Sequence, residues 1–261
     1  MRISFSASMM TAAAAMLLWM PAPAAAQAPA AKAQTSAIPR LADGKPDFNG
    51  VWDRPRVQDI SKTVDECGSG SKGCKSEPGE ISMTEWGKAQ FTAKGKFDYA
   101  GYCQPWGYTR AWQTEYPVEL MQTPNRVAVL WESNNVFHVV PTDGRDHPKN
   151  ADPTWMGNSV GHYEGDTLVI DTTNFNGKTW LDTAQHPSSD QLHIVERFHY
   201  IDSDHIAYEV TWEDPKAYTK PIKNNRTFTR MKKGSEIMEW WCMENNRDML
   251  MGHMVDGGKP E

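Results

Sequence analysis

Beyond its first 26 residues, the sequence has no apolar run long enough to cross a membrane, which takes roughly 20 residues in a helix. We expect no G-x-S-x-G nucleophile elbow, no H-E-x-x-H, no P-loop and no G-x-G-x-x-G motif, which sets aside serine hydrolases, zinc proteases and nucleotide enzymes. Its 27 basic residues are scattered among 33 acidic ones, without a lysine or arginine stripe. We therefore expect no nucleic-acid partner and no attachment to anionic membranes.

The first 26 residues are typical of a secretory signal peptide. Arg2 supplies the positive start, residues 9–20 are a short apolar run, and Ala24-Ala25-Ala26 offers an A-x-A cleavage site. Residues 27–38 are rich in alanine and predict a disordered linker. We expect residues 39–261 to form a single domain in the periplasm or outside the cell.

Four cysteines are present, and an even number in an exported chain favours disulfides. Cys67 and Cys74 bracket a Gly/Ser-rich loop that a bridge can close, which leaves Cys103 to pair with Cys242. Four cysteines allow three pairings, and only loop length favours this one. A zinc site is the alternative, but no C-x-x-C pair or histidine partner stands at ligand spacing.

Alternating apolar and polar runs, separated by Gly, Pro, Asn and Asp, predict an all-β fold. The expected strands are residues 51–53, 118–122, 126–132, 136–140, 158–164, 167–174, 192–200, 206–212, 223–231 and 236–243. Their short links predict an antiparallel up-and-down meander of nine or ten strands, closed into a barrel because closure removes exposed edges. Residues 61–112 predict a loop-rich insertion with one short helix at 84–93.

Two resemblances support this fold. Gly50-Val51-Trp52, together with the late Arg230, resembles the lipocalin or calycin arrangement, in which such a Trp closes the barrel floor and a late Arg packs on it. Longer strings, which span nearly the whole mature chain, resemble a family of uncharacterised secreted bacterial proteins: DGKPDFNGVW (43–52), DPTWMG (152–157), GDTLVIDT (165–172), WLD (180–182), LHIVER (192–197) and EDPKAYTKP (213–221). That second resemblance implies no reaction, and Asn158 and Ile222 depart from its pattern, which has His and Trp there.

Glu196 is the first candidate for chemistry. In the strand 192–200 it shares a face with four apolar or aromatic residues: Leu192, Ile194, Phe198 and Tyr200. Burial of a lone carboxyl raises its pKa toward the range useful for acid–base catalysis. The alternative is a structural salt bridge to Arg226 or Arg230.

The loop 175–191, at one rim of the barrel, holds the second group: Trp180, Asp182 and His186. A histidine titrates near neutral pH, and Asp182 could fix its tautomer. The alternative is that His186, which precedes Pro187, only shapes the turn. Asp171 and Asn174 end a strand beside this loop, where they contact a substrate or cap the strand.

His138, His162 and His193 lie on predicted strands and offer an alternative metal site. A lone strand histidine is more often a hydrogen-bonded core residue, so we expect no metal and no cofactor. Trp180, His193 and Tyr208 complete the residues expected to contact a substrate. The high aromatic content favours an apolar, aromatic or sugar-like molecule.

These features predict an exported small-molecule enzyme, a lyase, hydratase or isomerase that works by acid–base chemistry. His186 is the expected base, Glu196 the acid and Asp182 the group that orients the histidine, with all three facing a common hollow. The alternatives are a non-catalytic periplasmic carrier of a hydrophobic ligand, or a structural protein with a solid barrel.

Overall fold

The computed structural model describes residues 37–57, 59–61, 81–93, 98–114 and 116–244, and the backbone of three short strands: β2 (Lys75–Ser76), β11 (Met254–Val255) and β12 (Lys259–Pro260). The expected signal peptide, nearly all of the expected linker, and Cys67 and Cys74 lie outside these residues. Among the described residues, no helix is both long and apolar enough to cross a membrane.

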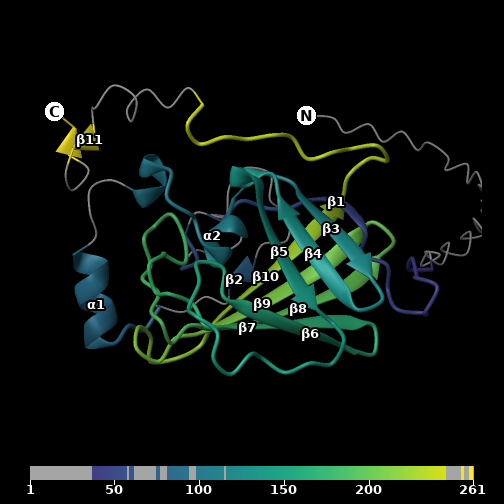
Figure 1. Cartoon of the computed structure of the whole chain (residues 1–261), viewed down its shortest axis with the longest axis horizontal. Coiled ribbons are helices and arrows are strands. Elements are labelled where there is room, and N and C mark those ends of the chain that lie inside the picture. The colour runs from purple at the N-terminus through teal and green to yellow at the C-terminus, as the bar shows by residue number, and fades with distance from the viewer. Residues whose placement is uncertain are drawn as a thin grey trace, which may run out of the picture. The chain divides into compact units, whose positions relative to one another are not determined.

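Nine antiparallel strands form a nearly closed barrel (Figure 1). Their order around the sheet is β5 (Val136–Pro141), β4 (Arg126–Trp131), β3 (Val118–Thr123), β1 (Gly50–Asp53), β10 (Ile222–Arg230), β9 (His205–Glu213), β8 (His193–Asp202), β7 (Thr167–Thr173) and β6 (Asn158–Glu164). The first of these strands in the chain, β1, pairs with the last, β10, and the short β2 adds to β10. The predicted all-β meander is therefore confirmed, and the barrel is consistent with a lipocalin-like one.

The prediction of a strand at residues 236–243 is wrong, because these residues form no strand. A turn does form at 232–235, where Ser235 N donates to Lys232 O. The chain cannot return along β10, however, because β1 and β9 already occupy both edges of that strand. It runs instead past β4 and β5, where Trp240 N donates to Asn135 Oδ1 at 3.2 Å and Asn135 Nδ2 donates to Trp240 O at 2.7 Å.

The segment 61–112 contains more helix than the sequence indicates. The predicted helix is α1 (Glu85–Thr92), and its N-cap Thr84 accepts from Gly87 N at 3.0 Å as expected. Two further helices, η2 (Tyr99–Tyr102) and α2 (Tyr108–Ala111), follow in the same segment, and η3 (Ser133–Asn135) links β4 to β5. The short α2 matters most, because it carries residues into the core.

The barrel interior is filled by aromatic rings around Trp112, directly after α2. Trp112 packs against Trp131 of β4 at 4.9 Å, against Tyr208 of β9 at 5.3 Å and against Phe228 of β10 at 5.7 Å between ring centroids. The inward face of β9 is the one that alternation predicts, because Ile206, Tyr208, Val210 and Trp212 are all buried. Dense aromatic packing thus occupies the centre where a hollow was expected.

Two long-range links hold the ends of the domain. The guanidinium of Arg230 lies 4.2 Å from the ring centroid of Trp52, which is the Trp–Arg contact that the lipocalin resemblance predicts. Cys103 and Cys242 form a disulfide with Cα atoms 5.5 Å apart, which confirms that pairing. A disulfide fits a protein exported to an oxidising compartment.

Candidate functional site

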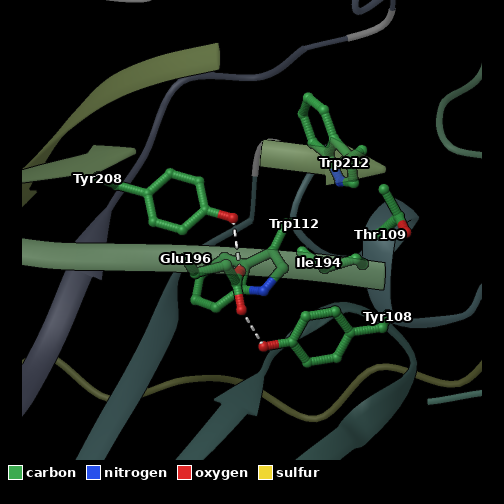
Figure 2. Close-up of a pocket in the computed structure, with 7 residues that line it drawn as sticks. All are labelled: Tyr108, Thr109, Trp112, Ile194, Glu196, Tyr208 and Trp212. Atoms are coloured by element: carbon green, nitrogen blue, oxygen red, sulfur yellow. Dashed lines mark hydrogen bonds between the residues drawn. The ribbon is translucent and has the colours of Figure 1, made fainter. Parts of the chain in front are cut away.

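Glu196 lies on β8 inside the barrel and is completely buried. Its neighbours are tyrosines, not the arginines expected of a salt bridge. Tyr208 of β9 donates to Oε1 at 2.6 Å, and the hydroxyl of Tyr108 on α2 donates to Oε2 (Figure 2). Burial raises the pKa of Glu196 to about 7, and the two tyrosine hydrogen bonds and the charge of Arg226 oppose that rise.

Arg226 forms no salt bridge with Glu196 and hydrogen-bonds other groups instead. Its guanidinium donates to Asn224 Oδ1, to the carbonyl of Trp112 and to Gln113 Oε1. Arg54 also donates to the carbonyl of Trp112, at 2.7 Å. The two buried arginines therefore satisfy the carbonyls that follow α2 and fix Tyr108 and Trp112 in the core.

The space beside Glu196 is closed. Seven side chains line it, as Figure 2 shows, and they leave no room for a water-sized sphere. The residues are Tyr108, Thr109, Trp112, Ile194, Glu196, Tyr208 and Trp212. A substrate cannot reach the carboxyl in this conformation, so Glu196 can act on one only through other groups.

Strands β5 and β6 lie at the two ends of the sheet order and share no backbone hydrogen-bond ladder. We call the line where they meet the seam. Side chains join it: His138 Nε2 on β5 lies 2.6 Å from Ser159 Oγ on β6. Gly161 brings the strands close, because a Cβ on it would stand 3.1 Å from Val140 Cγ1 and 3.0 Å from Thr142 Cγ2.

A pocket of about 250 Å³ opens on the seam. His138, Val139, Pro141, Arg145, Asp146, Pro148, Gly157, Asn158, Ser159 and Val160 line it. Its volume is just below the range of roughly 300–1,000 Å³ that is usual for drug-sized ligands, so it suits a smaller molecule. Its lining mixes apolar walls with several polar groups, which is the composition of a binding site.

His138 is neutral at physiological pH. Burial lowers its pKa to about 4, because the cationic form would lose its hydration. The ring packs edge-on against Tyr108, with centroids 5.1 Å apart. Nδ1 has no hydrogen-bond partner among the described residues, whereas Nε2 is held by Ser159. The imidazole can therefore accept a proton at Nδ1 while it exchanges one at Nε2.

Ser159 continues the polar contacts inward. Its hydroxyl lies 2.7 Å from Thr172 Oγ1 on β7. Tyr108 lies further inward, where burial and the charge of Glu196 hold its pKa well above the usual value. Hydrogen-bonded side chains thus run from His138 in the pocket wall to the buried Thr172.

The sequence analysis did not predict that His138 and Ser159 meet, although a sequence motif does mark Ser159. Gly157-Asn158-Ser159-Val160-Gly161 reads G-x-S-x-G, the string that marks the serine nucleophile of α/β-hydrolases. There the serine sits on a turn between a strand and a helix, whereas here it lies within β6. The motif therefore marks Ser159, but the strand-to-helix turn that exposes the nucleophile of a hydrolase is not present at this position.

His186 and Asp182 meet as expected, in the loop between β7 and β8. His186 Nδ1 lies 2.6 Å from Asp182 Oδ2, and both residues are buried. Asp182 also accepts from Ile60 N at 2.8 Å, and the Phe91 ring stacks on the imidazole at 5.1 Å. Among the described residues, no contact connects this pair to Glu196, so the predicted acid and base belong to separate groups.

The other candidates lie in several places. Asp171 accepts from His147 at 2.8 Å and from His193 at 2.9 Å, on the outer side of the barrel. Trp180 packs on Tyr99 at 4.8 Å. Asn174 donates to Asn158 Oδ1 at 2.7 Å and so supports a residue of the seam pocket.

The three histidines of the alternative metal site do not converge. His138 binds Ser159, His162 lies 3.2 Å from Glu164, and His193 binds Asp171. In the described part of the chain, the group with metal-ligand spacing is instead Asp59, Asp182 and His186. Hydrogen bonds already use these ligand atoms, since Ser61 N donates to Asp59 Oδ1 at 2.9 Å and His186 binds Asp182.

The fold and the seam together define an antiparallel barrel with a filled interior, a small lateral pocket and a buried acid, and the ring of Tyr108 packs on His138 of the pocket while its hydroxyl donates to that acid. Comparison with family models, with curated proteins and with solved structures finds no match for this chain.

Proposed function

We propose that the chain is an exported small-molecule enzyme that works by acid–base chemistry in the seam pocket, with His138 as the group that meets the substrate. The observation that supports this proposal most is the protonation and hydrogen bonding of His138. It is a neutral imidazole in the wall of a pocket of about 250 Å³, with Nε2 on Ser159 and Nδ1 unpartnered among the described residues. A general base needs this combination of access and neutrality.

A lyase, hydratase or isomerase fits best, because these reactions require a proton to be taken and returned. Ser159 is less suited to attack a substrate, since its hydroxyl lies between His138 and Thr172 and no group among the described residues orients His138 through Nδ1. We assign Ser159 to positioning His138. This moves the proposed base from His186 to His138, whose ring packs on Tyr108, a donor to Glu196.

A carrier of a hydrophobic ligand would need an apolar hollow inside the barrel. The aromatic cluster around Trp112 and the closed space beside Glu196 oppose that function. The seam pocket also has Arg145, Asp146 and Asn158 in its wall, which suit a polar molecule better than a lipid-like one. The enzyme is therefore the better supported of the two.

The test is proton exchange. The protein, produced in the periplasm, is first examined by native mass spectrometry to identify any co-purified molecule. That molecule and a panel of small carbonyl compounds and sugars are then incubated with the protein in D₂O, and deuterium uptake is followed by NMR. We expect one of them to exchange, and His138→Gln to slow that exchange by at least about 100-fold.

His162→Gln is the matched control, because His162 lies on β6 but is exposed, and its side-chain partner among the described residues is Glu164. It should exchange at the wild-type rate. A folded His138→Gln protein that exchanges as fast as wild type would rule out His138 as the base. A ligand that binds the seam pocket and neither exchanges nor converts would favour a carrier.

A further inference from the structure

We propose that the seam pocket selects a small neutral carbonyl compound, and that the side-chain amide of Asn158 is the donor that holds its carbonyl oxygen. The use of this contact in catalysis rests on the proposed function, in which His138 takes a proton from the same molecule. The contact itself is a binding property of the pocket and can be tested without turnover.

Asn174 sets the orientation of the Asn158 amide. Asn174 Nδ2 donates to Asn158 Oδ1 at 2.7 Å. It also donates to the carbonyls of Ala151 and Asp152, each at 3.0 Å. An atom surrounded by three oxygens is the NH₂ end of its amide, so the atom of Asn158 that faces it is the oxygen. The NH₂ group of Asn158 is therefore turned away from Asn174, and it has no hydrogen-bond partner among the described residues.

The backbone around Asn158 is also held in place. Asn158 pairs with Thr173 of β7. Gly157, just before it, packs so closely against that strand that a Cβ on it would stand 2.7 Å from Thr173 O. Asn174 has a φ of 63°, a left-handed conformation that asparagine adopts more readily than most residues. The donor is therefore positioned before a ligand arrives, which is the arrangement that best stabilises a developing negative charge.

The charges of the pocket wall favour a neutral ligand over an anion. Arg145 is the cation among the lining residues, but its guanidinium is already paired with Asp143, with Nε 2.9 Å from Oδ1 and Nη2 2.5 Å from Oδ2. Asp146 also lines the pocket and adds a negative charge. A carboxylate would meet this excess of negative charge, whereas the oxygen of a ketone or aldehyde can accept from Asn158 without that repulsion.

The rest of the lining limits the size of the ligand. Its apolar wall is formed by Val139, Pro141, Pro148 and Val160. A cavity of about 150 Å³ holds a benzene-sized ring, so a pocket of about 250 Å³ has room for a six-membered ring with a small substituent. We therefore expect a short-chain or single-ring carbonyl compound that carries a hydrogen on the carbon next to the carbonyl.

The amide and the imidazole have complementary tasks in a turnover. The C–H bond next to the carbonyl breaks, its proton joins His138 Nδ1, and its electron pair moves onto the carbonyl oxygen, which the Asn158 amide holds as an enolate. Return of the proton from Nδ1 restores a neutral carbonyl compound, so no other reactant is consumed. The donor is needed because burial lowers the pKa of His138 to about 4, and so weak a base removes a carbon-bound proton only when the charge left behind is stabilised.

The first measurement is binding. Cyclohexanone is the neutral probe, and cyclohexanecarboxylate is the anion with the same ring. The side-chain amide signals of Asn158 are followed by NMR in ¹⁵N-asparagine-labelled protein during titration with each probe. Cyclohexanone should shift these signals in a saturable way and bind at least about 10-fold more tightly than the carboxylate.

The decisive variant is Asn158→Asp, because its carboxylate keeps an acceptor for Asn174 but offers the ligand a second acceptor in place of the donor. It should bind cyclohexanone about 5- to 10-fold more weakly than wild type. Asn158→Ala, which removes the amide without adding a charge, should show a similar loss. The matched control is Asn225→Asp, because Asn225 is exposed on β10, which lies in the middle of the sheet order and away from β6. It should bind as wild type does.

Asn174→Gly tests the positioning of the amide. Glycine accepts the left-handed backbone at this position and removes the group that orients Asn158. The preference for cyclohexanone over the carboxylate should therefore decrease. A purely structural contribution of Asn174 would lower the melting temperature and leave this preference unchanged, and that result in a folded variant would refute the positioning.

The inference would be overturned by a cyclohexanone affinity that is the same in wild type and in folded Asn158→Asp and Asn158→Ala, or that does not exceed the affinity for the carboxylate. A failure of the proposed function gives a different result. Binding through Asn158 without any proton exchange keeps the donor and refutes the enzyme. With a compound that does exchange, Asn158→Ala should slow the exchange by about 100-fold, as the loss of one oxyanion donor does. Exchange that His138→Gln loses and Asn158→Ala keeps would retain the base and refute the donor.

Discussion

His138 Nε2 on β5 and the Ser159 hydroxyl on β6 lie 2.6 Å apart across two neighbouring strands that share no backbone ladder. Elsewhere around the barrel, backbone hydrogen bonds hold each strand to the next. Here side chains replace them, and the gap that remains forms the pocket. An unsealed seam thus gives a small molecule access to a barrel whose interior is otherwise filled.

The first prediction concerns stability against pH. The pKa of Glu196 in the folded protein, about 7, exceeds its ordinary value of 4.5. The free energy of unfolding that this shift contributes is therefore fully present below pH 4.5 and is lost as the pH rises to 7. The pKa of His138 in the folded protein, about 4, is below its ordinary value of 6.5. The free energy of unfolding that this shift contributes is fully present above pH 6.5 and is lost as the pH falls to 4. The two slopes oppose each other between pH 4.5 and 6.5.

Single variants should reveal each slope. Relative to wild type, Glu196→Gln should gain stability as pH rises from 5 to 6.5, and His138→Asn should lose it, each by up to about 1.4 kcal/mol per pH unit. Urea unfolding at several pH values gives these differences, and the other titrating groups cancel in the comparison. Two variants whose pH profiles run parallel to wild type would contradict both assignments.

The second prediction concerns the filled core. Trp112 is buried against rings from several strands, so Trp112→Ala should lose about 3–5 kcal/mol and leave an apolar cavity. Indole should bind there and raise the melting temperature of the variant but not of wild type. Trp241→Ala is the control, because Trp241 is 58% exposed and should cost less than about 0.5 kcal/mol.

Alternation along each strand is enough to predict the barrel, the inward face of β9 and the burial of Glu196. The partners of Glu196 are not predictable in this way, since Tyr108 is 88 residues away in a segment without strand periodicity. The His138–Ser159 contact is hidden for a related reason, because β5 and β6 are not a hairpin and no register links them. Local patterns predict elements and faces, whereas the site depends on where non-consecutive segments meet.

The third prediction concerns the disulfide between Cys103 and Cys242, which are 139 residues apart in the chain. In the chain-entropy model, a loop of that length contributes about 5 kcal/mol. Replacing both cysteines by Ser should lower the free energy of unfolding by about that amount and increase the denaturant dependence, because the unfolded chain expands. The Cys67→Ser, Cys74→Ser pair should cost less, about 2–3 kcal/mol, since any loop it closes is short.

The last prediction separates a structural from a catalytic His186. Asp182 is fully buried, and His186 supplies two of its hydrogen bonds, from Nδ1 at 2.6 Å and from the backbone N at 3.1 Å. His186→Ala removes the side-chain donor from a buried carboxylate, which should cost about 1.5–3 kcal/mol. A melting curve of this variant measures that loss.

His186→Asn distinguishes the two functions, because an asparagine amide can donate to Asp182 as Nδ1–H does but cannot accept a proton from a substrate. If His186 only supports the loop, the Asn variant should melt near wild type and keep the proton exchange that His138→Gln loses. If His186 is the base, the Asn variant should fold normally and lose exchange by at least about 100-fold. That second result would return the catalytic site from the seam to the loop between β7 and β8.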